Sequence, residues 1–557
     1  MVRPNVKTYV LWIYQKIKRR FPLILALTLL SIAVSFSGIC FVYFTKELVN
    51  SAVAANGHQL RLAGALMISL SLFQVLGNLI LRYFSSNVQE GLERDMKHSV
   101  LSTILHSEYS AISCHHSSDL IQRMDSDGES ILQGVTFLTT GLSGVITSLV
   151  GSAAALLMLA PGFTLLSAAF LIAMSSSSLL FSDRLKELSI QTSEANGRVR
   201  GFLYESISKL MVIQALDAAP EVQLRSELAL DRRWKVRKKW RNISILSQLG
   251  PDSIDNLSYL LALVWSAWRL LSGSITYGDV TLMLAMITRV RSSAAVLTNV
   301  IPRWISITAS CDRIMELEAL PQQPDPDRES VRALYGSLTG FTADHLSFAY
   351  DREPVLTNVS LTIPKGGMTV IVGQSGIGKS TLLKLLLGLY RPDSGRLSID
   401  TPDGPVSVDR STRSLFSYAP QGNFLLSGTL RKNLTFTNPH ATEEEIRQAL
   451  HVSVMDEYVA SLPQGLETVL LENGAGLSEG QAQRLSLARA ILSGAPVLLL
   501  DEVTSALDEA TEATVLERIC ALPDRTCIAV THRPAALKLA TSIIEVTEEG
   551  MALRKCE

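Results

Sequence analysis

Residues Gly373-Gln374-Ser375-Gly376-Ile377-Gly378-Lys379-Ser380-Thr381 decide the fold of the second half of this chain. The apolar run 368–372 precedes them and predicts a buried strand, and the run 382–387 follows them and predicts a helix. A glycine-rich loop in this context binds phosphate, because glycines let successive backbone N–H groups face one anion and the helix N-terminus adds partial positive charge. We therefore expect the whole loop to contact a nucleotide. Lys379 would reach its β and γ phosphates, and the Ser380 hydroxyl would ligate Mg²⁺.

The composition indicates that the rest of the chain is not an ordinary soluble protein. A chain of 557 residues is too long for one core, so we expect at least two domains. Hydrophobic residues make up 47% and charged residues only 18% of it. The net charge is −1, so no overall positive field indicates a nucleic-acid partner, and none is expected.

The first half predicts a transmembrane domain of helices alone. Six apolar stretches, each long enough to cross a hydrocarbon core of about 30 Å, lie near residues 21–45, 61–84, 133–160, 163–182, 245–272 and 279–301. Short turns are expected at 161–163 and 273–278. The polar segments 85–132 and 183–244 have helical periodicity, so the membrane helices should continue well beyond the bilayer.

Basic residues indicate the orientation of this domain. They cluster at 16–20, before the first apolar stretch, and at 232–239, in the second long polar segment. The positive-inside rule then places the long segments and both termini in the cytoplasm, in a multi-pass protein of the cell membrane.

Charged residues also lie inside the fifth and sixth stretches. They are Asp252, Asp255, Arg289 and Arg291. Charges inside a bilayer are costly and commonly line a pathway, so all four are candidates for a substrate pathway. The alternative is that they neutralise one another across two packed helices, or that they face water at a cavity mouth.

A proline-rich polar segment, 321–328, separates the two halves. We expect a transmembrane domain over 1–318, a linker over 319–337 and an α/β nucleotide-binding domain over 338–557. In the last of these, Tyr350 follows a strand-like run and is placed to stack on an adenine ring. Gln421 follows another such run and is placed to ligate Mg²⁺ and sense the γ-phosphate through its amide oxygen.

Two further strand ends carry polar residues suited to phosphoryl transfer. The apolar run 497–500 leads into Asp501, a candidate Mg²⁺ ligand, and Glu502, a candidate for polarising the attacking water. His532 follows the apolar run 527–531 and is a candidate for bonding the γ-phosphate, since α/β folds bind ligands at the carboxyl ends of their strands.

The run Leu477-Ser478-Glu479-Gly480-Gln481 resembles the signature of ATP-binding cassette transporters, which is usually Leu-Ser-Gly-Gly-Gln. The other motifs of that family match in order and spacing. Gly373 to Thr381 resembles its phosphate loop, Tyr350 its adenine-stacking aromatic and Gln421 its Q-loop. Asp501 and Glu502 resemble its magnesium-site acid and catalytic base, Asp508 belongs to a run like its D-loop, and His532 resembles its switch histidine. The six spans with long cytoplasmic helices look like the exporter type, so the resemblance covers nearly the whole chain.

The resemblance implies ATP and Mg²⁺ as cofactors and a head-to-tail pair of nucleotide domains. Each ATP would lie between the phosphate loop of one chain and Ser478, Gly480 and Gln481 of the other. The intact catalytic positions favour a homodimer, although a heterodimer stays open. Two positions depart from the family: Glu479 replaces a glycine, and the loop around Glu472 lacks the usual arginine.

The function implied is an ATPase that drives transport of a polar or amphipathic substrate, by export or lipid flipping. An importer built on the same fold is the first alternative, and the direction of transport in vesicles would distinguish it. A nucleotide-gated regulatory membrane protein is the second. The presence of both Glu502 and His532 argues against it, because a gate does not need turnover.

Overall fold

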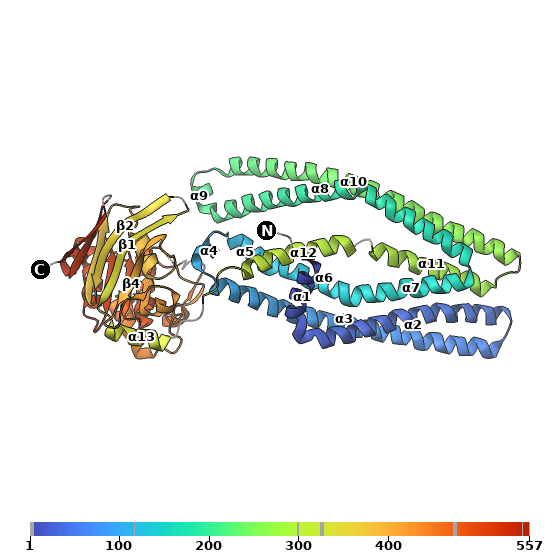
Figure 1. The fold of residues 1–557 in the computed structure, drawn as a ribbon, viewed down its shortest axis with the longest axis horizontal. Helices are drawn as coiled ribbons and strands as arrows, with labels where there is room; N and C mark the ends of the chain where they lie inside the picture. Colours follow the sequence, from blue (N-terminus) through green and yellow to red (C-terminus); the bar gives the residue numbers. More distant parts are fainter. Residues whose placement is uncertain are drawn as a thin grey trace. The chain divides into compact units, whose positions relative to one another are not determined.

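The structure is a computed structural model that describes residues 5–115, 117–297, 300–323, 328–351, 353–422, 424–471, 476–547 and 550–555. It divides into two compact units (Figure 1). The first comprises Met1–Leu101 and Ser118–Glu316, and the second comprises Ser102–Ser117 and Leu317–Glu557. The expected transmembrane domain over 1–318 thus differs from the first unit, because residues 102–117 pack with the second.

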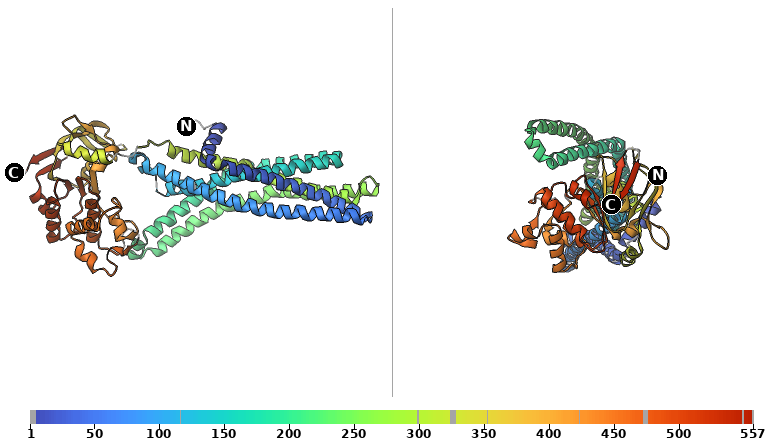
Figure 2. Two further views of the ribbon diagram at one scale, coloured as in Figure 1. Left: turned by 90° about the horizontal axis from the view of Figure 1, so that it is seen from below. Right: turned by 90° about the vertical axis from the view of Figure 1, so that its left-hand side faces the viewer.

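The first unit is built of helices. These are α1 (Val6–Ile17), α2 (Phe21–Val53), α3 (Gly57–His106), α5 (Ser117–Gln122), α6 (Gly128–Thr136), α7 (Leu142–Leu159), α8 (Pro161–Ser208), α9 (Leu210–Ala215), α10 (Ala219–Leu271), α11 (Tyr277–Leu297) and α12 (Val300–Glu318). The long polar segments do form helices that continue the apolar ones, as expected. Helices α8 and α10 lie side by side over most of their length and are joined by the short α9 (Figures 1 and 2).

By length and composition, four helical segments of the described chain can cross a membrane. They are Val6–Val53, Gly57–His106, Asp119–Leu159 and Tyr277–Leu297. These coincide with four of the six expected spans. The other two fall on α8 and α10, in which the side chains of 166–180 and 248–255 lie outside the described residues.

The predicted turn at 161–163 is wrong by a few residues. Pro161 begins α8, and the chain turns at Ala160, whose φ and ψ are −151° and 74°. Proline is favoured at the first position of a helix, because its φ suits the helix and it has no N–H that would need a partner there. The expected turn at 273–278 is confirmed over most of its length, since α10 ends at Leu271 and α11 begins at Tyr277.

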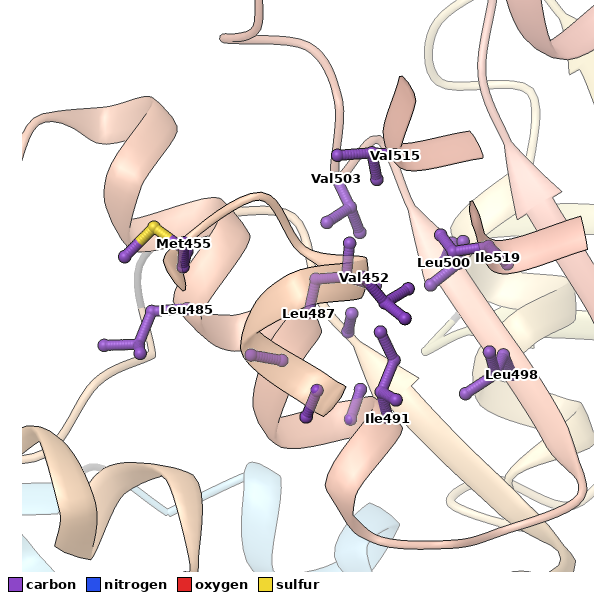
Figure 3. Packing of buried hydrophobic residues seen from close by; sticks show 14 of the residues in the cluster. Val452, Met455, Leu485, Leu487, Ile491, Leu498, Leu500, Val503, Val515 and Ile519 are labelled. Carbon is purple, nitrogen blue, oxygen red and sulfur yellow. The ribbon is translucent and has the colours of Figure 1, made fainter. Parts of the chain in front are cut away.

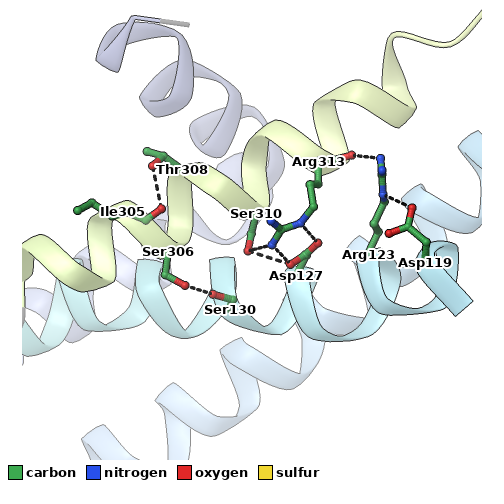
Figure 4. A network of polar contacts seen from close by, with 9 residues as sticks. All are labelled: Asp119, Arg123, Asp127, Ser130, Ile305, Ser306, Thr308, Ser310 and Arg313. Atoms are coloured by element: carbon green, nitrogen blue, oxygen red, sulfur yellow. Dashed lines mark hydrogen bonds and ion pairs between the residues drawn. The ribbon is translucent and has the colours of Figure 1, made fainter. Parts of the chain in front are cut away.

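Two π-helical turns interrupt the segment before α7, which the sequence pattern does not show. They are Arg123–Asp127 and Phe137–Gly141. The first leads into an ion-pair network with α12 (Figure 4). The buried Asp127 accepts from Arg313 Nε at 2.6 Å and from Ser310 Oγ at 3.0 Å. Arg123 donates to the Glu316 carboxylate at 2.8 Å, so this network ties α6 and its preceding turn to α12.

The second unit combines two sheets. The six-stranded sheet has the order β12-β11-β3-β10-β9-β6, in which the pairings are parallel except for that of β12. Its strands are β3 (Gly367–Gly373), β6 (Phe416–Ala419), β9 (Val497–Asp501), β10 (Thr526–Val530), β11 (Ser542–Thr547) and β12 (Gly550–Lys555). The antiparallel sheet has the order β2-β1-β4-β5 and contains β1 (Gly340–Tyr350), β2 (Glu353–Pro364), β4 (Ser394–Asp400) and β5 (Val406–Ser407).

Helices surround these sheets. They include α13 (Arg328–Ser337), α14 (Lys379–Leu386), α15 (Leu430–Leu434), α16 (Glu443–Val452), α17 (Asp456–Ser461), α18 (Glu479–Leu492), α19 (Glu509–Cys520) and α20 (Pro534–Leu539). Helix α13 lies within 319–337, the segment expected to be a linker. The tip helix α4 (Tyr109–Ser113) also belongs to this unit.

Strand β9, between β10 and β6, separates two hydrophobic cores. Leu498 and Leu500 point into the core formed with α16, α18 and α19 (Figure 3). Val497 and Leu499 point into the other core, which lies between the two sheets and contains α14. Because successive side chains of a strand alternate between its faces, a strand that is apolar throughout must be covered on both sides. This burial holds the carboxyl end of β9 firmly in place.

Candidate functional site

The glycine-rich loop joins β3 to α14 as predicted. Gly373, at the end of β3, has a φ of 152°, and a Cβ there would lie 2.5 Å from the Val546 carbonyl oxygen. Gly378 is the N-cap of α14 with a φ of 104°, and a Cβ there would lie 2.8 Å from Leu356 Cδ2. Both positions therefore require glycine, and together they set the curve of the loop around the N-terminus of α14.

Lys379 is the first residue of α14 and is 5% exposed. Its Nζ donates to the carbonyl oxygens of Gly373 at 2.6 Å and Gln374 at 2.7 Å. Both of these partners are neutral, so they hold the ammonium group at the loop without cancelling its charge. An anionic phosphate bound in the loop would balance the positive charge of the Lys379 ammonium group.

The next residue of the loop reaches the end of β9. Ser380 Oγ donates to Asp501 Oδ1 at 2.9 Å, and Tyr418 OH donates to Asp501 Oδ2 at 3.1 Å. Burial, with a smaller contribution from Asp501, raises the pKa of Tyr418, so its hydroxyl stays protonated and donates to the carboxylate. The sequence reasoning missed Tyr418. The signal available was its place directly before Ala419, the last residue of the strand that pairs with β9.

Glu502 follows β9 in a left-handed backbone conformation, with a φ of 51°. Its backbone N–H donates to the Val530 carbonyl oxygen of β10 at 3.0 Å, and its side chain accepts from Gln421 Nε2 at 2.6 Å. The predicted base and the predicted Q-loop residue are thus in direct contact, although 80 residues separate them along the chain.

The parallel register brings three strand ends to one edge of the sheet. Val530 of β10 pairs with Ile371 of β3 on one side and with Asp501 of β9 on the other. His532 is exposed and follows β10 by two residues, so it lies at this same edge. Tyr350 ends β1, and its OH lies 3.4 Å from Thr381 Oγ1 on α14.

The signature residues form the start of α18. Ser478 is its N-cap and makes a capping box with Gln481: Ser478 Oγ accepts from Gln481 N at 3.3 Å, and Gln481 Oε1 accepts from Ser478 N at 2.8 Å. A Cβ on Gly480 would lie 3.1 Å from the Ala506 carbonyl oxygen, so a larger residue would press on the D-loop. Glu479 is exposed in the first helical turn, where a carboxylate is favoured by the helix dipole. The fold of α18 therefore accommodates a glutamate where the family usually has a glycine.

Gln483 connects α18 to the D-loop, and the sequence reasoning missed it. It is 4% exposed; its Nε2 donates to Ser505 Oγ at 3.1 Å and its Oε1 accepts from Ala506 N at 3.2 Å. Asp508 caps α19, and its hydrogen bonds from Thr511 hold its pKa below the ordinary value. Among the described residues, no hydrogen bond links the signature residues Ser478, Gly480 and Gln481 to the phosphate loop of the same chain. Glu472 lies outside the described residues.

The charged candidates in the membrane part are placed only in part. Arg289 of α11 lies against α2, since a Cβ on Gly38 would meet its guanidinium nitrogens at 2.8 Å. Arg291 is half-buried on the same helix. Asp252 and Asp255 lie on α10, and their side chains are outside the described residues, so the structure does not show what they face.

Comparisons with known proteins agree with this arrangement. Residues 356–505 match the family model described as ABC transporter, and residues 24–292 match the model described as ABC transporter transmembrane region. The uncharacterized ABC transporter ATP-binding protein YfiC of Bacillus subtilis is 26% identical over 495 residues, which is 88% of this chain and 81% of that protein. The mycobactin import ATP-binding/permease protein IrtB of Mycolicibacterium smegmatis is 31% identical over 435 residues, 76% of this chain and 74% of that protein. Alignments with two other relatives span 54% and 56% of those proteins, about half of their lengths.

A solved structure shows the same fold. It is titled as a bacterial Atm1-family ABC exporter with ATP bound, and it matches with a TM-score of 0.82 at 21% identity, covering 96% of this chain and 94% of that one. The chain therefore belongs to the ATP-binding cassette transporter family. It is a multi-pass membrane protein that binds ATP, and its ATPase domain is coupled to transport.

Proposed function

We propose that this chain is one half of a homodimeric transporter in the cell membrane that exports or flips a polar or amphipathic substrate. The observation that carries the ATPase part is the contact between Gln421 and Glu502 at 2.6 Å, beside Ser380 and Asp501 at 2.9 Å. These two contacts bring the proposed base, the proposed Q-loop residue and two candidate Mg²⁺ ligands to one edge of the sheet. In this proposal 1–318 form the transmembrane domain, 338–557 form the nucleotide-binding domain, and both termini are cytoplasmic.

The donor set at this edge fits Mg²⁺. The ion favours oxygen ligands and keeps water and phosphate oxygens in its shell, so one carboxylate with one hydroxyl and one amide is sufficient. Ser380, Gln421 and Asp501 would hold it, and the bound ion would supply positive charge to the phosphates during transfer. No group of three or more His, Cys, Asp or Glu residues forms a separate metal cluster in the described chain.

The protein's own residues then perform the rest of the reaction. Lys379 and the loop N–H groups bind the β and γ phosphates, and the half-buried ring of Tyr350 provides a surface for the base. Glu502 orients the attacking water, and His532 bonds the γ-phosphate from the end of β10. Positioning and charge dominate phosphoryl transfer, so these rigid strand ends are suited to it.

The dimer follows from the signature segment. The N-terminus of α18 carries Ser478 and Gly480 on the D-loop side of the domain, and its partial positive charge suits a phosphate. Since no described contact brings it to the phosphate loop of its own chain, we propose that it binds the ATP held by a second copy.

Import is the second candidate function, and a specific observation favours it. IrtB, a relative at 31% identity, is named as a mycobactin importer. The exporter structure shares the fold at 21% identity, which does not decide the direction.

Inside-out membrane vesicles test the direction. Vesicles with the wild-type protein are incubated with ATP and a cell extract, and the lumenal compounds are compared by mass spectrometry with those of Glu502→Gln vesicles. Export predicts that a compound accumulates only with the wild type. Loss of preloaded compounds from the lumen would instead support import. ATP hydrolysis with neither change would contradict transport by this chain.

A further inference from the structure

The second unit contains a short helical tip that lies beside the nucleotide site. The tip follows the end of α3 at His106 and forms α4 (Tyr109–Ser113). Glu108 N donates to the Pro321 carbonyl oxygen at 2.9 Å, and the Glu108 side chain pairs with Arg391 at 2.5 Å. These contacts hold Glu108, the N-cap of α4, in a defined place on the nucleotide domain.

Three tyrosine rings form a row that begins in this tip with Tyr109. The rings of Tyr109 and Tyr390 are perpendicular, with centroids 5.5 Å apart, and the rings of Tyr390 and Tyr350 are perpendicular at 5.3 Å. Phe348 packs on both Tyr350 and Tyr390, at 4.9 and 5.3 Å. Tyr390 is half-buried, and this burial raises its pKa despite its hydrogen bond with Ser113 of the tip.

The far end of this row belongs to the nucleotide site. Tyr350 OH lies 3.4 Å from Thr381 Oγ1, one residue after the Ser380 that contacts Asp501. The row therefore joins the tip of a long helix to the ring proposed to receive the base. Residues 109, 350 and 390 are far apart in sequence, so the arrangement exists only in the folded unit.

We propose that Tyr390 is a positioning residue for the nucleotide base: held between Tyr109 and Tyr350, it sets the orientation of the Tyr350 ring and links base binding to the position of the helical tip. This inference rests on the proposed role of Tyr350 as the base platform. Perpendicular aromatic pairs have a preferred geometry, so displacement of one ring changes the orientation of the next. Coupling of this kind is reciprocal: the tip affects affinity for the base as much as the base affects the tip.

The test compares a ligand that has a base with one that lacks it. Affinities for ATP and for inorganic tripolyphosphate are measured by calorimetry on the full-length protein in Mg²⁺-free buffer. The variants are Tyr350→Leu, Tyr390→Leu and Tyr109→Leu. Tyr390→Phe is the matched control that keeps the ring, and Arg396→Ala is the control that breaks an ion pair with Asp344 in the same unit, which involves neither a ring nor the tip.

We expect Tyr350→Leu and Tyr390→Leu to weaken ATP binding about two- to tenfold, the range set by one aromatic pair, while tripolyphosphate binding stays unchanged. Tyr109→Leu should weaken ATP binding in the same selective way and should have no further effect in the Tyr350→Leu background. Both controls should bind like the wild type. Because Tyr109 is exposed, its variant still tests the proposal if Tyr390→Leu does not fold.

Three results would overturn the inference, and each has a different meaning. If Tyr350→Leu selectively weakens ATP binding but neither Tyr390→Leu nor Tyr109→Leu does, the row is only packing and the base platform stands. If Tyr350→Leu has no base-selective effect, the platform itself is wrong. An equal loss of ATP and tripolyphosphate binding in Tyr390→Leu and Tyr109→Leu would show that the rings merely support the phosphate loop.

Discussion

Glu502 adopts a backbone conformation that its residue type normally avoids. Its φ of 51° carries a cost of roughly 1–3 kcal/mol for a residue other than glycine. The hydrogen bond from Glu502 N to Val530 and the contact with Gln421 hold it there. Because of this conformation, the chain turns at the end of β9, and the Glu502 carboxylate lies at the edge of the sheet beside Gln421.

We expect Glu502→Gln to lose almost all ATP hydrolysis while it still binds ATP, because a neutral amide cannot accept the proton of water. Positioned bases contribute about 10²- to 10⁴-fold, so a loss of that size is expected. Phosphate release and ATP calorimetry measure the two effects. Glu509→Gln, an exposed acid at the start of α19, is the control and should hydrolyse ATP normally. Hydrolysis within a few-fold of wild type in Glu502→Gln would exclude Glu502 as the base.

At the scale of elements, α18 acts through its N-terminus. Ser478 caps the helix and is also proposed to face the ATP of the partner chain. A bulky replacement would remove the cap and block the ATP contact at once, so the two effects could not be separated. Aspartate retains the capping ability and adds a negative charge. Ser478→Asp should therefore repel phosphate while α18 stays folded.

This variant gives a test of the shared site. Chains with Lys379→Ala are combined with chains with Ser478→Asp, and ATPase activity is measured in dimers of verified mixed composition. One composite site then carries both lesions and the other carries neither, so activity should partly return. The control places both lesions in one chain opposite a wild-type chain, which damages both sites and should stay inactive. Equal activity in the two mixtures would argue against a site shared between chains.

The ion-pair network between the π-helical turn Arg123–Asp127 and α12 permits a second element-scale prediction (Figure 4). Asp127 is 3% exposed and holds Arg313 and Ser310 together. Asp127→Asn should lower the midpoint temperature of thermal unfolding by several degrees, because the Arg313 guanidinium would then pair with a neutral amide instead of a carboxylate. Asp125→Asn is the control: Asp125 is exposed and pairs with Lys97 on the surface, where ion pairs contribute little. Equal midpoints for the two variants would mean that the network does not stabilise the helices.

At the scale of the whole molecule, the candidate pathway residue Arg289 and the proposed base Glu502 belong to different units. Arg289 lies against Gly38 in the membrane part and far from the sheet edge in sequence. If it lines the substrate pathway, Arg289→Gln should abolish vesicle accumulation but retain ATP hydrolysis, and Arg289→Lys should keep part of the transport. Arg291→Gln, two residues away and thus on another face of α11, is the comparison. Normal transport in Arg289→Gln would remove it from the pathway.

The sequence alone was sufficient for the class of fold and for the positions of the motifs that make up the proposed nucleotide site. The phosphate loop, the strand before Asp501 and the signature are local patterns, and local backbone geometry follows from residue type through glycine φ angles, apolar runs and capping boxes. The apolar stretches likewise predict helices, because the bilayer allows few other structures.

Only the tertiary structure showed which distant side chains meet. The contacts of Gln421 with Glu502, Tyr418 with Asp501, Gln483 with the D-loop and Tyr390 with Tyr109 join segments that no periodicity connects. The same is true of the left-handed conformation of Glu502, which parallel strand pairing imposes. Such features depend on the packing of both faces of β9 and on strand register, which arise from the summed burial of the whole unit and not from the residues next to each site.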